Sequence, residues 1–235
     1  VDLRRCDGCV GLEKPPQCTQ ACNLAHYVPE GMEWVEVYHT EINKHSGGTY
    51  FFPLHCQQCE NPPCTNVCPV GATFATPEGP ILIDQKRCIG CRMCMAACPY
   101  DRRFFNWGHP NQPPEAKARD AQYHPEEQVP AYIGTVMKCD MCPEMGRAGK
   151  VPYCVDGCPR GAIYYGDLEE DMASNGREIV KVSSYLAKNQ AYRYKEHLGT
   201  QPRVYFIPGH GQDAGRNPYD PRESRRKELQ WQRGP

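Results

Sequence analysis

The cysteines of this chain fall into four groups with one shared pattern. Residues 88–99 read CIGCRMCMAACP, in which four thiols lie within eleven residues and a proline follows the last. Every group begins with Cys-x-x-Cys and ends with Cys-x-x-x-Cys, and only the middle gap changes, at eight, four, two and eleven residues. The groups are Cys6, Cys9, Cys18 and Cys22; Cys56, Cys59, Cys64 and Cys68; Cys88, Cys91, Cys94 and Cys98; and Cys139, Cys142, Cys154 and Cys158. No cysteine is left over, so the pattern is a strong internal repeat.

Three chemistries use thiols in such groups. Sixteen cysteines could form disulfides in an oxidising compartment, structural zinc sites, or cubane iron–sulfur clusters. The Cys-x-x-Cys start does not separate them, because zinc ribbons and redox dithiols share it. The third group favours clusters, since its first three thiols can hold one cubane while the fourth, just before proline, ligates a neighbour. We therefore expect four 4Fe–4S clusters, with a zinc- or disulfide-stabilised scaffold as the alternative.

Composition excludes several classes of partner. Lys and Arg total 27 against 28 for Asp and Glu, a net charge of −1, so nothing favours a nucleic-acid partner or an anionic membrane surface. No apolar run approaches the roughly 18 residues of a membrane-spanning helix, so any membrane attachment would go through a partner. The chain opens VDLRRCDGC, without Met or an apolar signal region. We expect that a leader has been removed.

Short elements surround the cysteine groups. The second group continues as CPVGATF and the fourth as CPRGAIYY, in which proline stops the preceding turn and the Gly-Ala pair leaves room for backbone beside a cluster. We predict short strands at 81–83 and 163–165 and a turn at 76–80. The rhythm of 178–190 predicts a helix, capped by Ser174 or Asn175. Gly199 should end a helix before a further strand.

Such short strands, tight loops and single helical turns describe a ferredoxin-like module. We expect an α+β fold that contains two such modules. A polar, proline-rich loop at 108–131 should connect them. Residues 208–235 contain the charge run RESRRKE and little to bury, so we interpret them as an extended partner-binding arm, with disorder as the alternative.

The sequence resembles a known family. Its four groups, with HCQQCENPPCTNVCPVGATF and CIGCRMCMAACPYDRRFFNW, look like the four-cluster ferredoxin subunit of complex iron–sulfur molybdoenzymes and related respiratory complexes. Dimethyl sulfoxide reductase, polysulfide reductase and the membrane complexes of sulfate reducers are examples. The resemblance covers roughly residues 1–207, including YRYKEHLGTQPRVYFIPG. It implies an electron-transfer subunit with no active site of its own.

The resemblance also implies how the groups combine: groups one and four (1–55 with 132–207) form one of two interlocked modules, and groups two and three (56–107) form the other. It further implies which thiols share a cluster. Carried over by position, the four ligand sets are Cys6, Cys9, Cys18 and Cys158; Cys22, Cys139, Cys142 and Cys154; Cys56, Cys59, Cys64 and Cys98; and Cys68, Cys88, Cys91 and Cys94. Group one departs from the family, with eight residues between Cys9 and Cys18 where many relatives have two. We keep Cys18 as a ligand because group four tolerates eleven; alternatively the longer loop contacts a partner.

The same resemblance implies partners and a location. Electrons would pass between a large catalytic or pterin-binding-type subunit, or a cytochrome c subunit, and an integral-membrane quinone-interacting subunit. The expected location is the periplasm or the outer face of the cytoplasmic membrane, held there by the partners. The alternative is the ferredoxin subunit of a soluble cytoplasmic molybdoenzyme. The substrate of the whole complex lies beyond this chain.

Several other residues invite a functional interpretation. None of the eight histidines follows a Cys-x-x-Cys pair, so covalent haem is not indicated, and we expect His55 to be an ordinary surface or packing residue. We expect Trp107 to be a core aromatic. A set of cations crowds groups two and three and either forms a solvated face or raises cluster potentials: Lys86, Arg87, Arg92, Arg102 and Arg103. No phosphate loop, HExxH or Ser-His-Asp signature appears.

Overall fold

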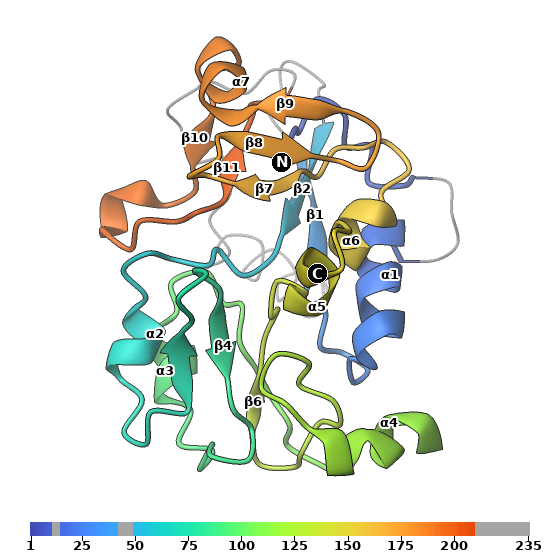
Figure 1. The fold of residues 1–235 in the computed structure, drawn as a ribbon, viewed down its shortest axis with the longest axis vertical. Coiled ribbons are helices and arrows are strands. Elements are labelled where there is room, and N and C mark those ends of the chain that lie inside the picture. The colour runs from blue at the N-terminus through green and yellow to red at the C-terminus, as the bar shows by residue number, and fades with distance from the viewer. Residues whose placement is uncertain (11–14, 42–48, 210–235) are drawn as a thin grey trace, which may run out of the picture.

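The computed structural model describes residues 1–10, 15–41 and 49–209 (Figure 1). Short helices alternate with short strands, and α1 (Gln17–His26), the longest described helix, has ten residues. This confirms the expected α+β class. Across these residues no helix has the length and apolar character needed to cross a bilayer.

The described strands form five small antiparallel sheets. Four are two-stranded, pairing β1 (Glu36–Glu41) with β2 (Thr49–Leu54), β3 (Thr73–Ala75) with β4 (Ile81–Ile83), β5 (Phe104–Phe105) with β6 (Val136–Met137), and β10 (Tyr192–Arg193) with β11 (Tyr205–Phe206). The fifth joins β7 (Tyr165–Asp167), β8 (Met172–Ser174) and β9 (Ile179–Lys181) in chain order, at the top of Figure 1. Sheets this small cannot carry a core alone.

The remaining helices are single turns or little more. They are α2 (Pro63–Asn66), α3 (Met93–Ala97), α4 (Pro114–Ala118), η1 (Arg119–Gln122), α5 (Pro143–Arg147), α6 (Tyr153–Asp156), α7 (Val182–Lys188) and η2 (Glu196–Leu198). Proline opens α2, α4 and α5, where its fixed φ suits the first helical turn. Because helices of this length are marginal alone, packing must hold them.

Helices from different cysteine groups pack in pairs. Helix α1 lies against α6, and α2 lies against α3. The first pair joins groups one and four, and the second joins groups two and three. Gly157 marks the closest approach in the first pair, since a Cβ there would stand 2.6 Å from the Cβ of Ala21.

The apolar core lies in three clusters, and cysteines belong to each. One surrounds Phe52 and Phe206, whose rings stack at 4.5 Å, and includes Cys59. Another surrounds Trp34 and includes three cysteines: Cys18, Cys22 and Cys158. The smallest includes Cys94. These five cysteines therefore lie in the packed interior.

The structure confirms some expected local elements. The strand at 81–83 is β4, and the turn before it is closed by the Gly79 amide, which donates to the Thr76 carbonyl at 3.0 Å. Gly199 ends η2 at φ 70°, in the left-handed region that suits glycine. The strand expected after it is β11.

Other local predictions were wrong. Only Tyr165 of 163–165 is in a strand, because Ile163 packs into the cysteine-containing core. The first residues of 178–190 form β9, paired with β8, and α7 begins at Val182. Asp171 caps that helix in place of Ser174 or Asn175, accepting the Ser183 amide at 2.6 Å and its hydroxyl at 2.7 Å.

The connection at 108–131 is not loop throughout. It contains α4 and η1, because the prolines of this segment start a helix as readily as they interrupt one. The arm expected at 208–235 falls almost wholly on residues 210–235, which lie outside the described residues. It stays a prediction.

Candidate metal centres

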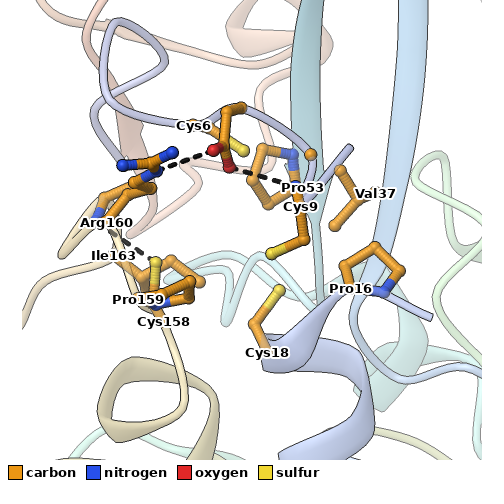
Figure 2. Close-up of a pocket in the computed structure, with 13 residues that line it drawn as sticks. Cys6, Cys9, Pro16, Cys18, Val37, Pro53, Cys158, Pro159, Arg160 and Ile163 are labelled. Carbon is orange, nitrogen blue, oxygen red and sulfur yellow. Dashed lines mark hydrogen bonds and ion pairs between the residues drawn. The ribbon is translucent and has the colours of Figure 1, made fainter. Parts of the chain in front are cut away.

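One pocket gathers four thiols from two distant segments of the chain. We call it site 1; its cysteines are Cys6, Cys9, Cys18 and Cys158. Figure 2 shows their sulfurs facing a shared space, with Val37 and Pro53 on one side. Cys18 thus lies with Cys6 and Cys9 despite the long gap in group one.

The loop that carries Cys6 and Cys9 is fixed by its neighbours. Gly8 has φ +63°, and a Cβ on it would lie 2.2 Å from the Phe51 ring, so a larger residue would clash there. Asp7 accepts the Cys9 amide at 3.0 Å and the Arg160 Nε–H at 2.6 Å. This carboxylate ties the first thiols to the segment after Cys158.

A second pocket gathers the next complete set. Site 4 consists of Cys68, Cys88, Cys91 and Cys94, around a space of about 290 Å³. Cys91 is exposed, and its neighbours Ile89 and Met93 are 64% and 52% exposed. Site 4 therefore reaches the molecular surface.

The matching Cys-Pro-x-Gly-Ala segments make the same contact at sites 1 and 4. The Ala162 amide donates to Cys158 Sγ at 3.3 Å, and the Ala72 amide donates to Cys68 Sγ at 3.2 Å. Burial raises the pKa of Cys68, but backbone N–H groups at 70–73 outweigh it and leave that pKa below its usual value. The loop after Cys68 therefore stabilises that sulfur in its anionic form.

Site 2 is assembled from groups one and four: Cys22, Cys139, Cys142 and Cys154. Burial raises the pKa of Cys139 to about 12. Burial also raises the pKa of Cys22 and of Cys142, and the nearby Asp140, Cys139 and Cys154 raise both further. Helix α1, which carries Cys22, packs against α6, which carries Cys154, and His26 at the end of α1 lies 3.3 Å from Cys142 Sγ.

Site 3 is assembled from groups two and three: Cys56, Cys59, Cys64 and Cys98. Burial raises the pKa of Cys59 to about 12, and Cys56, Cys98 and Cys64 add to the rise. Burial likewise raises the pKa of Cys98, again with Cys56 as a neighbour. The structure thus brings the complete sets of sites 1 and 4 together in pockets, and the sets of sites 2 and 3 stay those that the resemblance implies.

A buried cation lies between sites 3 and 4. Arg103 is 3% exposed; it donates to Cys64 Sγ and to Thr73 Oγ1, both at 3.0 Å. Burial lowers its pKa, but thiols of both sites, led by Cys64 and Cys94, more than reverse that effect. Within the described residues no carboxylate pairs with Arg103. The sulfurs are its counter-charge.

Neighbouring sites adjoin one another in a fixed order. Cys18 of site 1 raises the pKa of Cys154 of site 2, after burial and Cys139. Cys56 of site 3 contributes in the same way to Cys139 of site 2, and Cys64 of site 3 to Cys94 of site 4. Gln58 reinforces the central junction, because its Nε2 donates to the Cys139 carbonyl at 3.0 Å. Helix α1 carries a thiol of site 1 and one of site 2, Gln58 links site 3 to site 2, and Arg103 lies between sites 3 and 4, so the sites follow one another in the order 1, 2, 3 and 4.

The donor sets fit thiolate-bound metal. All sixteen cysteines are free of disulfides, and four-sulfur sets suit zinc or iron–sulfur clusters. Buried thiols with raised pKa values hold their protons until a metal replaces them. Amide and guanidinium groups directed at sulfur are the contacts that stabilise an anionic cluster.

Two of the singled-out residues have different environments. The pKa of His55 is lowered to about 4 by burial, and its Nδ1 lies 2.9 Å from the Cys56 carbonyl oxygen, as expected of a packing residue. Trp107 is 69% exposed, so the expectation of a core position was wrong. Arg92 covers its ring at 4.6 Å, and Phe105 packs on its edge, which leaves one face toward solvent.

The five cations separate into two kinds. Lys86, Arg87 and Arg92 are exposed, as a solvated face would be. Arg102 and Arg103 are buried, and Arg102 pairs with Glu36 at 2.8 Å. It is Arg103 that donates a hydrogen bond to a cysteine sulfur.

Sequence reasoning missed His26 and Gln58. Gln58 lies inside Cys-x-x-Cys, where its side chain carries no pattern. His26 follows Cys18 and Cys22 at successive four-residue steps, which places all three along one face of α1. That spacing was the available signal, and the structure places the His26 ring against Cys142.

Comparisons with known proteins agree with this chemistry. Residues 48–112 match the family model of the 4Fe-4S dicluster domain. The chain is 36% identical over 224 residues to a Halobacterium salinarum protein assigned as the iron–sulfur subunit of a dimethyl sulfoxide reductase, covering 89% of this chain and 78% of that protein.

Two further relatives are also named as reductase subunits. A selenate reductase subunit from Mesobacillus selenatarsenatis is 37% identical over 217 residues, with 88% of this chain and 70% of the relative covered. A tetrathionate reductase subunit from Salmonella typhimurium is 32% identical over 216 residues, with the same coverage of 88% and 70%. This chain belongs to the family of 4Fe–4S iron–sulfur subunits of the complex iron–sulfur molybdoenzyme type.

Proposed function

We propose that the chain relays electrons through four 4Fe–4S clusters, one held at each of sites 1 to 4. The clusters supply one-electron redox chemistry when bound. The protein supplies the thiols, the N–H donors and the spacing. The observation that carries this proposal is the order in which α1, Gln58 and Arg103 connect each site with the next.

The pairing of helices supports two interlocked ferredoxin-like modules. Helix α1 carries Cys18 of site 1 and Cys22 of site 2, and α6 carries Cys154 of site 2 just before Cys158 of site 1. Because the two helices pack together, sites 1 and 2 share both of them. The packing of α2 on α3 gives sites 3 and 4 the same relationship.

A relay needs a donor and an acceptor. The relatives are named as subunits of dimethyl sulfoxide, selenate and tetrathionate reductases. By analogy, this chain connects a large catalytic, pterin-binding-type subunit, or a cytochrome c subunit, with an integral-membrane quinone-interacting subunit. We place the complex on the outer face of the cytoplasmic membrane; the cytoplasm is the alternative, and cell fractionation distinguishes them.

Metal and sulfide analysis of anaerobically purified protein tests the central part of the proposal. Four complete thiol sets predict about sixteen iron and sixteen sulfide per chain, and a brown colour that dithionite bleaches. Because no set lacks a thiol, the oxidised protein should show no stoichiometric three-iron EPR signal. A colourless protein with about four zinc ions per chain would instead establish the scaffold alternative.

A further inference from the structure

A buried histidine connects a carboxylate to one thiol of site 2. His26 Nε2 lies 3.3 Å from Cys142 Sγ, and His26 Nδ1 lies 3.5 Å from Asp140 Oδ2. All three residues are buried, and their candidate ligand atoms lie within 4.8 Å of one another. His26 and Cys142 are 116 positions apart in the chain, so tertiary packing creates this contact.

The imidazole is held in a fixed orientation. It is the last residue of α1, with Trp34 tilted against it at 5.1 Å and the edge of Tyr153 at 5.5 Å. Asp140 Oδ1 accepts the Cys142 amide at 2.9 Å, so this carboxylate positions both the backbone of the ligand and the ring. The buried Asp140 Oδ2 accepts no hydrogen bond from the described residues, and the His26 ring, with Nδ1 at 3.5 Å, is the cationic group that it can face.

The chemistry of the three groups assigns their roles. A thiolate and a carboxylate are both acceptors, so the ring can donate to both only as the imidazolium, which carries an N–H on each nitrogen. A hydrogen bond to a ligand sulfur stabilises a cluster more after it gains an electron, because the negative charge on sulfur increases. Such bonds are one of the means by which proteins set cluster potentials.

We propose that His26, oriented by Asp140, donates its Nε2–H to Cys142 Sγ and thereby raises the reduction potential of the cluster at site 2. This inference rests on the proposed function, because it needs a cluster bound by Cys142. His26 then acts on the cluster potential through Cys142 and is not itself a ligand.

A separate metal ion bound by His26, Asp140 and Cys142 is the competing interpretation. It is disfavoured because Cys142 is already one of four thiols that share site 2. Three protein ligands would also leave a zinc ion short of the four that closed structural sites have. Metal analysis separates the two, since a stoichiometric zinc ion beside a full iron content would overturn the proposal.

The test compares three variants by redox titration monitored by EPR. His26→Phe keeps a ring between Trp34 and Tyr153 but removes the donor; His26→Gln keeps an N–H donor. His124→Phe is the matched control, because His124 is exposed and faces Glu126. We expect one of the four midpoint potentials to fall in His26→Phe, to recover at least partly in His26→Gln, and to stay unchanged in His124→Phe. Unchanged potentials in His26→Phe with full iron content would overturn the proposal.

Labelling with ¹⁵N-histidine tests the same bond in the unmodified protein, which covers the case that His26→Phe does not fold. Pulsed EPR of the reduced protein should detect a weak histidine nitrogen coupling to one cluster, absent from His26→Gln. No such coupling in fully loaded protein would refute the hydrogen bond. If the unmodified protein holds its full iron content, either outcome bears on the hydrogen bond alone. Low iron in the unmodified protein would count against the proposed function itself.

Discussion

Cys154 and Cys158 lie four residues apart, on α6 and just beyond it, yet they face different sites. Cys158 lines site 1 with thiols more than 130 residues earlier in the sequence, while Cys154 adjoins Cys139 in site 2. The site that each of these two thiols faces is therefore the most direct sign, among single residues, of how the chain folds.

Serine substitutions test this assignment. Cys158→Ser should perturb the EPR signal of site 1, and Cys154→Ser should perturb that of site 2, because serine oxygen is a poorer ligand for iron than thiolate sulfur. Spectra of the two variants, each compared with the parent protein, supply the measurement. If both substitutions removed the same signal and left the other intact, the sharing of thiols would be wrong.

Arg103 provides the second test at this scale. Arg103→Gln removes a buried positive charge that donates to Cys64 at 3.0 Å, so the clusters of sites 3 and 4 should become harder to reduce. A hydrogen bond to a charged group is worth about 1.5–3 kcal/mol, which limits the shift. Potentiometric titration measures it. Arg87→Gln is the control, since Arg87 is exposed; an equal shift in both variants would contradict a local role for Arg103.

The sequence predicted the ligands far better than their surroundings. Cysteine spacing is local, so the four groups are visible without a fold, and the family resemblance supplies their pairing. The contact of His26 with Cys142, 116 positions away in the chain, depends on tertiary packing, which the spacing along α1 can only suggest. Trp107 stays exposed although Arg92 and Phe105 cover part of its ring, and residue type alone does not reveal this position.

Among the elements, the contact of α1 with α6 does most to define sites 1 and 2. Both helices are short, and their close approach depends on the absence of a side chain at Gly157. The corresponding contact of α2 with α3 supports sites 3 and 4 independently.

Gly157→Ala should therefore act on one half of the molecule. Its Cβ would stand 2.6 Å from Ala21 Cβ and 3.1 Å from the Tyr153 carbonyl oxygen, and the helices must separate to accommodate it. We expect a loss of roughly 1–3 kcal/mol in the free energy of unfolding, with the clusters of sites 1 and 2 lost first on heating. Gly108→Ala is the control, because no described atom lies within 4 Å of the position that its Cβ would take. Equal stability of the two variants would contradict this role for Gly157.

Elements with a local cause were the predictable ones. The β3–β4 hairpin follows from its turn residues, and η2 ends at a glycine as expected. The segment 178–190 was misassigned because Ile179–Lys181 gains strand pairing with Met172–Ser174, a tertiary contact that outweighs its helical periodicity.

The whole molecule is organised as a row of thiol sets that ends at the surface. Site 4 is open around Cys91, and sites 2 and 3 meet in the interior at Gln58. A partner that exchanges electrons with site 4 could approach closely without any rearrangement of the fold.

Truncation tests whether residues 210–235 bind a partner. Deleting them should leave iron content unchanged, because every cysteine precedes them, yet weaken co-purification with the catalytic and membrane subunits. Affinity purification of the complex, with iron measured on the same sample, gives both readouts. Full assembly and normal quinone-linked electron flow in the truncated chain would exclude the arm interpretation.

EPR of the fully reduced protein tests most directly whether four adjoining clusters form a relay. Four clusters in adjoining sites should produce a complex spectrum broadened by spin–spin interaction, integrating to about four spins per chain. Selective loss of one cluster should simplify the signal of its neighbour. A set of sharp, mutually independent signals, or an integral well below four in protein with full iron, would contradict a relay built from adjoining clusters.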